Sequence, residues 1–374
     1  MKSMISPVRI TSYNYSPAAT LRPLSPSCSQ TISTSTSATT NTNLRLGKRW
    51  VEYQGTNNWS GLLDPLDDVL RSEILRYGQF IQNAYTSFTE DPSSPMITEM
   101  NNSGYRVTQH LYATSGINLP GRSSWIGYIA VCEDEDEISR LGRRDIVVTF
   151  RGTVTPFEWL ENLRAALTHL PCNSGPMVES GFFSLFTNPG PARRSLQDEL
   201  RHEIRRLLDL YSSNADSIPI SLTFTGHSLG AALAVLSAYD VTETFDDAPM
   251  VTVMSFGGPR VGNASFRRRL EEKGSKVLRI VNSQDIITKV PGFVLEEKNS
   301  GDVGVPKWLI LKTGWVYANI GCELRLDGDR TVNVAACHDL SLYLKLVNQL
   351  NSVSCSCPCP FEREPGFWRP FSTT

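Results

Sequence analysis

The first 50 residues contain no aspartate or glutamate, and they contain no continuous apolar stretch either. Serine and threonine dominate this region, as in the run QTISTSTSATTNTN, and its charges are basic residues such as Arg9, Arg22 and Arg45. This basic, hydroxylated and acid-poor composition is typical of an organelle transit peptide, whereas a secretory signal needs an apolar core of about 7–15 residues. We therefore expect residues 1–45 to be a transit peptide, or else a disordered tail. The chloroplast is the favoured destination because Ser and Thr outnumber Arg, and the mitochondrion, or both organelles, is the alternative.

Long apolar runs and a strong net charge are missing from the rest of the chain. No run reaches the roughly 18–20 apolar residues that span a bilayer, so we expect no transmembrane segment. If the substrate is a membrane component, the protein has to meet it by peripheral membrane contact. A formal net charge of −2 gives no basis for nucleic-acid binding.

The eight cysteines do not form the spacing pattern of a disulfide framework, which favours a reducing compartment. Three of them, Cys355, Cys357 and Cys359, crowd the C-terminus, but three ligands do not close a tetrahedral zinc site. We expect no metal site, and we interpret residues 351–374 as an irregular tail.

Residues 50–350 have the pattern of one large domain. Asp64-Pro65 predicts a helix N-cap, and apolar residues at helical spacing follow as far as Tyr85. The segments WIGYIAVC (125–132) and DIVVTF (145–150) predict two strands, and the acidic residues at 133–137 predict a hairpin turn between them.

Further along, predicted strands alternate with predicted helices. We expect strands at 218–225, 251–256 and 276–281, and helices at 196–211, 231–239 and 265–273. Such alternation indicates a mainly parallel sheet covered on both faces by helices.

The most informative motif is Gly226-His227-Ser228-Leu229-Gly230, which stands between a predicted strand and a helix rich in small residues. In a nucleophile elbow the central serine adopts a strained conformation, and small residues on either side let strand and helix approach. A glycine-rich turn with a capping serine is the alternative, but the context favours a catalytic Ser228 in an α/β-hydrolase fold.

A serine hydroxyl needs a base to take its proton, and in this fold the partners follow in the order Ser, acid, His. His338 is the sole histidine after the elbow, so it is the candidate base. The candidate acid is Asp285, which follows the predicted strand at 276–281 and would hold the imidazole in the required tautomer. Rival acids are Asp240, Asp246 and Asp247 in a helix end and a loop, and Asp327 or Asp329 in a predicted surface turn.

Acyl transfer also needs two donors for the developing oxyanion. The backbone N–H of Leu229 follows the nucleophile and is the first candidate. Thr153 ends the FRGT segment after the strand at 145–150, and its backbone N–H is the second candidate. A plain turn with an arginine ion pair is the alternative interpretation of this segment.

In these motifs the sequence resembles the class 3 lipase family, and more closely the plant plastid-type (class I) phospholipases A1. The resemblance covers roughly residues 50–347 and includes NWSGLLDPLD, SWIGYIAV, DIVVTFRGT, VESGF, GHSLGAALA, SFGGPRVGN, RIVNSQDIITKVPG and CHDLSLYLKLV. It implies the triad Ser228, Asp285 and His338 with oxyanion donors Thr153 and Leu229. It also implies a mobile lid, here residues 156–176, with Phe157, Trp159, Leu160, Leu163 and Leu167 on an apolar face; a surface helix packed on the core is the alternative.

The sequence thus predicts a serine acyl hydrolase that needs no cofactor and acts on a membrane glycerolipid. The resemblance suggests cleavage at sn-1 of phospholipids and galactolipids, with released fatty acids available for oxylipin (jasmonate-type) synthesis. A triacylglycerol lipase is the first alternative. A lipase-like signalling protein that only binds a ligand is the second, although such a protein has no need of an intact Ser, Asp and His.

Overall fold

A computed structural model of the protein describes residues 45–90, 104–115, 122–153, 166–171, 175–212, 218–294, 316–328 and 334–350. Nearly all of the predicted transit peptide, and the whole predicted tail, lie outside the described residues. Within the described part no helix is long and apolar enough to cross a membrane.

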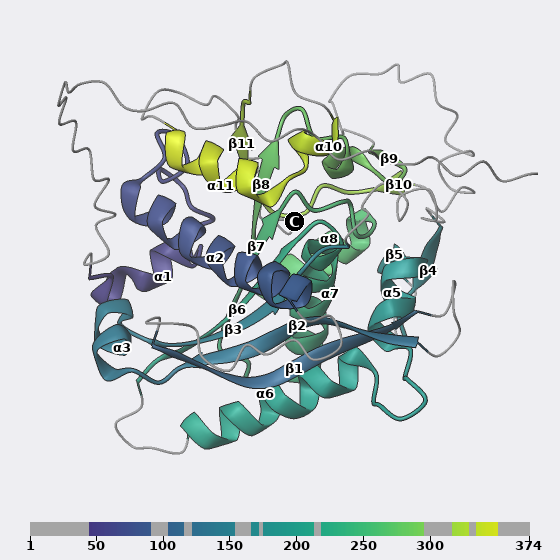
Figure 1. Cartoon of the computed structure of the whole chain (residues 1–374), viewed down its shortest axis with the longest axis horizontal. Helices are drawn as coiled ribbons and strands as arrows, with labels where there is room; N and C mark the ends of the chain where they lie inside the picture. Colours follow the sequence, from purple (N-terminus) through teal and green to yellow (C-terminus); the bar gives the residue numbers. More distant parts are fainter. Residues whose placement is uncertain are drawn as a thin grey trace, which may run out of the picture. The chain divides into compact units, whose positions relative to one another are not determined.

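The centre of the structure is a seven-stranded sheet with strand order β1-β2-β3-β6-β7-β8-β11 (Figure 1). The strands are β1 (Tyr105–Ser115), β2 (Arg122–Cys132), β3 (Arg144–Phe150), β6 (Ile220–His227), β7 (Met250–Phe256), β8 (Lys276–Asn282) and β11 (Cys322–Leu326). The β1–β2 and β2–β3 pairs are antiparallel, and every pair from β3 to β11 is parallel. The predicted mainly parallel sheet is therefore confirmed. The carboxyl ends of its parallel strands meet at one edge, where ligands bind in such sheets.

Two small sheets lie outside the central one. In the first, β4 (Leu167–His169) pairs antiparallel with β5 (Met177–Glu179), and in the second β9 (Phe293–Val294) pairs parallel with β10 (Val316–Tyr317). Leu167, expected on the apolar face of the lid, thus belongs to a strand, while residues 156–165 and 172–174 of the predicted lid lie outside the described residues.

Helices cover both faces of the central sheet, as predicted. The described helices are α1 (Trp50–Tyr53), α2 (Asp68–Glu90), α3 (Glu135–Leu141), α5 (Ser180–Thr187), α6 (Leu196–Ser212), α7 (Leu229–Thr244), α8 (Ala264–Glu272), α10 (Val334–Cys337) and α11 (Leu340–Gln349), with 3₁₀ turns at Gly47–Arg49 and Ile287–Lys289. The alternation along β3 shows how one strand serves two cores. Ile146, Val148 and Phe150 belong to a core that also contains residues of α5, α6, α7 and α8, and Val147 belongs to a second core that contains residues of α1, α2 and α11.

Two local predictions were wrong for identifiable reasons. The N-cap of α2 is Asp67 rather than Asp64, because the Asp67 carboxylate accepts the N–H groups of Val69 and Leu70 at 2.9 and 3.0 Å. The acidic segment between β2 and β3 forms helix α3 rather than a hairpin turn. Its Asp134 caps the N–H of Glu137 at 2.8 Å, and acidic side chains in a first helical turn are favoured by the helix dipole.

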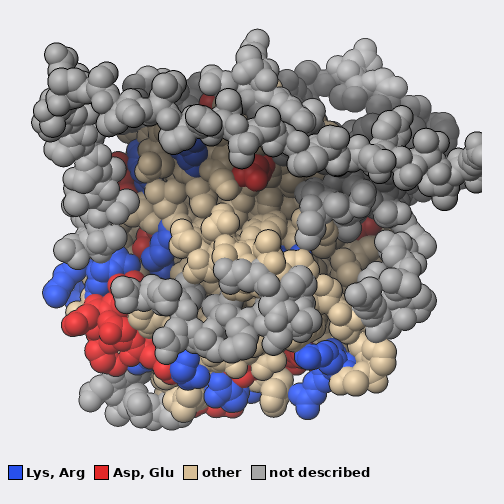
Figure 2. Space-filling model, in the orientation of Figure 1, with Lys and Arg blue, Asp and Glu red and all other residues tan. Residues whose placement is uncertain are grey.

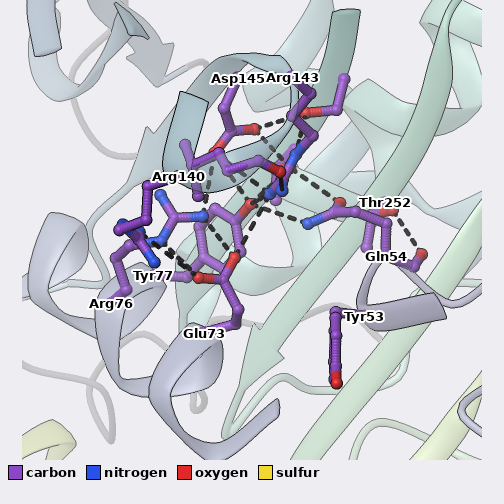
Figure 3. A network of polar contacts seen from close by, with 12 residues as sticks. Tyr53, Gln54, Glu73, Arg76, Tyr77, Arg140, Arg143, Asp145 and Thr252 are labelled. Carbon is purple, nitrogen blue, oxygen red and sulfur yellow. Dashed lines mark hydrogen bonds and ion pairs between the residues drawn. The ribbon is translucent and has the colours of Figure 1, made fainter. Parts of the chain in front are cut away.

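A buried network of charged groups fixes α2 to the amino ends of the parallel strands, the edge opposite the elbow (Figure 3). The fully buried Asp145, at the start of β3, accepts from Arg76 at 3.1 Å and from Tyr77 at 3.0 Å. Arg143 donates to Tyr77 at 3.0 Å and lies 3.4 Å from Glu73. Burial alone would raise the pKa of Asp145, but Arg143 and Arg76 outweigh it and hold that pKa below its usual value.

The Asp145→Asn variant is expected to lose about 3 kcal/mol of unfolding free energy at neutral pH, because it leaves buried arginines without one of their compensating charges. The measurement is urea unfolding followed by circular dichroism. Because the pKa of Asp145 is depressed in the fold, the stabilisation is present above the carboxyl's unfolded pKa and decreases as the pH falls below it.

The control is Glu52→Gln, which removes an exposed pair with Arg49 and is expected to change stability by less than about 1 kcal/mol. Equal effects of the two substitutions would mean that the buried charge of Asp145 contributes no more to the stability of the fold than an exposed ion pair.

Candidate active site

Ser228 sits on a sharp turn between β6 and α7. Its backbone has φ 57° and ψ −125°, a conformation that is strained for a residue with a side chain, and its N–H is held by the carbonyl of Phe256 at 3.0 Å. A Cβ on Gly226 would lie 2.3 Å from the backbone of Gly230, and a Cβ on Gly230 would lie 2.5 Å from the carbonyl oxygens of Phe150 and Arg151. Both flanking glycines are therefore required by close backbone approach, which is the geometry of a nucleophile elbow.

The structure brings Asp285 and His338 into direct contact from two distant parts of the chain. His338 Nδ1 lies 2.6 Å from Asp285 Oδ2, and both side chains are buried. Asp285 follows β8, while His338 lies between α10 and α11. If Nδ1–H donates to the carboxylate, then Nε2 has a free lone pair, which is the tautomer that a general base needs.

Two further groups hold the Asp285 carboxylate in place. The hydroxyl of Tyr343, on α11, donates to Oδ2 at 2.7 Å, and the N–H of Ile287 donates to Oδ1 at 2.9 Å. Burial, and then the charge of Asp285, raise the pKa of Tyr343 well above its ordinary value, so its hydroxyl keeps its proton. The role of Tyr343 was not predicted from the sequence, because a tyrosine on the apolar face of a helix resembles an ordinary core aromatic.

Rival acids lie elsewhere and have other partners. Asp240 pairs with Arg201 at 2.5 Å, and Asp327 pairs with Arg325 at 3.6 Å on the surface. Asp247 pairs with Arg205 at 3.9 Å, and Asp246 is exposed. Asp329 lies outside the described residues.

The loop after β3 closely approaches the elbow. An ideal Cβ built on Gly152 would be 3.0 Å from Ser228 Cβ, so Gly152, which precedes Thr153, lies beside the serine. Arg151 donates to the carbonyls of Trp125 and Gly152 at 2.7 and 2.6 Å and thereby holds the loop. Leu229 is the first residue of α7, so its N–H has no acceptor within the helix and lies at the positive end of the helix dipole.

Three buried polar atoms of this region have no hydrogen-bond partner among the described residues: Ser228 Oγ, His338 Nε2 and Thr153 Oγ1. An unpaired buried polar atom costs about 1–3 kcal/mol, so most are satisfied in native proteins. Here they come from the three segments in which the sequence predicted nucleophile, base and oxyanion donor. Such atoms are suited to receive a substrate ester and its transferred proton.

A second histidine, His227, lies in the same cluster. Its Nε2 lies 2.8 Å from the carbonyl oxygen of His338, and its Nδ1 lies 2.8 Å from the hydroxyl of Tyr85 at the end of α2. His227 precedes Ser228 in the chain and was therefore not expected to be the base, and Tyr85 was expected only to pack on the apolar face of its helix. Within the described residues no cluster of His, Cys, Asp or Glu is arranged to hold a metal ion.

Comparisons with known proteins find relatives of this chain. The family described as Lipase (class 3) matches residues 147–295. The chain is 54% identical over 362 residues to phospholipase A(1) DAD1, chloroplastic, of Arabidopsis thaliana, with 84% of this chain and 79% of that protein covered. It is 42% identical to galactolipase DONGLE, chloroplastic, of Arabidopsis thaliana (82% and 71% covered). It is 41% identical to phospholipase A1 EG1, chloroplastic/mitochondrial, of Oryza sativa subsp. indica (80% and 74% covered). Among solved structures, a triacylglycerol lipase from Penicillium expansum has 15% identity and a TM-score of 0.47, with 70% of this chain and 81% of that chain covered.

Proposed function

The chain belongs to the class 3 lipases, within them to the plant plastid-type phospholipases A1, and we propose that it hydrolyses the sn-1 ester of glycerophospholipids and galactolipids. Relatives that cover most of the chain are named phospholipase A1 and galactolipase, which supports both lipid classes as substrates. The observation that carries the proposal is the contact of Asp285 with His338, together with the unpaired buried oxygen of Ser228 on its strained turn.

In the proposed reaction Ser228 Oγ attacks the ester carbonyl carbon while its proton moves to His338 Nε2. The carbonyl π electrons move onto oxygen, and the resulting oxyanion is stabilised by the backbone N–H groups of Leu229 and Thr153. The tetrahedral intermediate collapses, the bond to the glycerol oxygen breaks, and His338 returns the proton to that oxygen. Water, deprotonated by His338, then attacks the acyl-enzyme, and the fatty acid leaves as Ser228 regains its proton.

Asp285 contributes by holding the imidazole and by stabilising its charged form. Both oxygens of its carboxylate accept hydrogen bonds. Oδ2 accepts from His338 and Tyr343, and Oδ1 accepts from the N–H of Ile287. This fixes the plane of the carboxylate, so the imidazole does not need to reorganise when it becomes positively charged.

We propose that the enzyme acts in the plastid on lipids that it reaches by peripheral membrane contact. Relatives named chloroplastic support the plastid, and the composition of residues 1–45 supports a transit peptide ahead of a catalytic domain at 50–350. Ile286, beside the candidate acid, is 41% exposed, which is unusual for a large apolar side chain in this structure. Uncharged residues also fill the middle of the face in Figure 2, over the C-terminal end of α2, while acidic side chains gather toward α3.

The proposal is tested by acyl release from vesicles of phosphatidylcholine, vesicles containing monogalactosyl diacylglycerol, and an emulsion of triolein. The assay uses the chain without residues 1–45 and compares it with the Ser228→Ala variant of the same truncated chain. We expect fatty acid and a lysolipid that retains its sn-2 chain from the first two substrates, and slower release from triolein. Preferred hydrolysis of triolein would instead indicate a triacylglycerol lipase. Folded protein that is inert on all three substrates would favour a lipase-like binding protein.

A further inference from the structure

A chain of hydrogen bonds connects the loop after β3 to the segment that carries His338. The N–H of Gly152 donates to the hydroxyl of Tyr85 at 2.8 Å. The same hydroxyl lies 2.8 Å from His227 Nδ1, and His227 Nε2 lies 2.8 Å from the carbonyl oxygen of His338. We call the side chains of Tyr85 and His227 the Tyr–His relay.

The direction of each hydrogen bond follows from the groups involved. The carbonyl of His338 can only accept, so His227 Nε2 carries a proton. Burial, and then the neighbouring His338, lower the pKa of His227 well below its ordinary value, so the ring is neutral and Nδ1 has no proton. Tyr85 therefore donates to Nδ1 and accepts from Gly152. Donors and acceptors match throughout, and bonds in such a chain reinforce one another.

The relay touches three segments in which the proposed mechanism has a role. Gly152 precedes the oxyanion candidate Thr153, His227 precedes the nucleophile Ser228, and the last acceptor is the backbone of the base itself. The fit is tight as well, because a Cβ on Gly152 would lie 2.3 Å from the Tyr85 oxygen. The ring centroids of His227 and His338 are 4.7 Å apart, so a neutral His227 avoids repulsion with the imidazolium that forms on His338 during the reaction.

We propose that Tyr85 and His227 are positioning residues. They hold the loop after β3, which carries the oxyanion candidate Thr153, in a fixed position relative to His338. The inference rests on the proposed acyl hydrolase function. Neither residue exchanges a proton with the substrate. They act by fixing the backbone N–H of Thr153 and the imidazole of His338 relative to the attacked carbonyl, where small displacements reduce the rate of reaction.

The test uses p-nitrophenyl butyrate, a soluble ester that removes the lipid interface from the kinetics. The wild type is expected to hydrolyse it, and Ser228→Ala is not. If neither protein is active, the proposed hydrolase function fails, and the relay, which rests on that function, fails with it. With an active wild type, Tyr85→Phe is expected to lower kcat about 10–100-fold and to leave KM within about threefold, because the lost alignment matters mainly in the transition state.

The matched control is Tyr77→Phe, the same substitution at a buried tyrosine on the same helix. Tyr77 donates to Asp145 in the charged network beside the first half of α2, so its loss is expected to lower the melting midpoint and to leave kcat within about twofold. All rates are measured well below each melting midpoint. A purely structural role for Tyr85 would give the two variants the same pattern of lower stability and unchanged kcat, and would overturn the proposal.

A double-mutant cycle tests whether the relay acts as one unit. His227→Gln retains a donor near the position of Nε2 but loses the acceptor that Tyr85 needs, so its kcat is expected to fall by about the same factor as that of Tyr85→Phe. The double variant is expected to be no slower than the slower single variant, since either change already breaks the chain. Losses in kcat that multiply would show two independent residues and overturn the relay.

Discussion

Replacing Ser228 with alanine is expected to lower kcat for ester hydrolysis at least about a thousandfold, the scale on which removal of a triad member acts. The proposed mechanism has no second nucleophile, because the acyl group is transferred first to Ser228 Oγ. What activity remains would come from oxyanion stabilisation and binding alone. The measurement is the rate of p-nitrophenyl butyrate hydrolysis together with fatty acid release from lipid vesicles.

The same variant is expected to be at least as stable as the wild type. Ser228 Oγ is buried without a hydrogen-bond partner among the described residues, so its removal breaks no bond and relieves an unsatisfied polar group. The backbone strain at φ 57° is the same for alanine as for serine. The control is Ser237→Ala on the same helix, where the lost hydroxyl donates to the carbonyl of Leu233 at 2.7 Å. Ser237→Ala should keep its activity and lose some stability. If Ser237→Ala were inactive and Ser228→Ala remained active, Ser228 would not be the nucleophile.

Replacing Asp285 with asparagine is expected to lower kcat about 10⁴-fold while the fold is retained. The carboxylate oxygens face only donors, from His338, Tyr343 and Ile287. An asparagine amide has one oxygen, so its NH₂ group has to face at least one of these donors. Where it faces His338, the imidazole moves its proton from Nδ1 to Nε2, and Nε2 can then no longer accept the proton of Ser228.

Asp327→Asn is the matched control for this variant, because among the rival acids that the structure describes Asp327 is the nearest in sequence to His338. It lies on the surface beside Arg325, and its loss is expected to change kcat less than about twofold. The rates are to be followed from pH 5 to 9, since a displaced imidazole proton also changes the form of the pH profile. A large loss of kcat in Asp327→Asn, together with an active Asp285→Asn, would identify Asp327, which follows β11, as the catalytic acid.

Much of the fold was predictable from local pattern. The central-sheet strands from Arg144 to Asn282 follow one another in the predicted order with the predicted helices between them, because buried parallel strands leave continuous apolar runs and helices leave a 3.6-residue period. The small β4–β5 sheet and α5 in the same stretch were not predicted. The errors came at element ends. Asp64 and Asp67 are equally good caps by composition, and only the turn that precedes α2 decides between them. The acidic segment after β2 was predicted as a turn because charge alone does not distinguish a turn from a helix N-terminus.

The sequence by itself determined the candidate nucleophile, base and acid, because chain order, a single downstream histidine and glycine spacing are linear properties that the fold class restricts. Only the tertiary structure decided which groups support them. Tyr85 and His227 are 142 residues apart in the chain, and Tyr343 is 58 residues from Asp285. Tyr85 was expected on a helix face and His227 in the elbow turn, while Tyr343 had no predicted role. Periodicity predicts that a side chain is buried. It does not predict which polar atom meets its hydroxyl or ring nitrogen, because that depends on how distant elements pack.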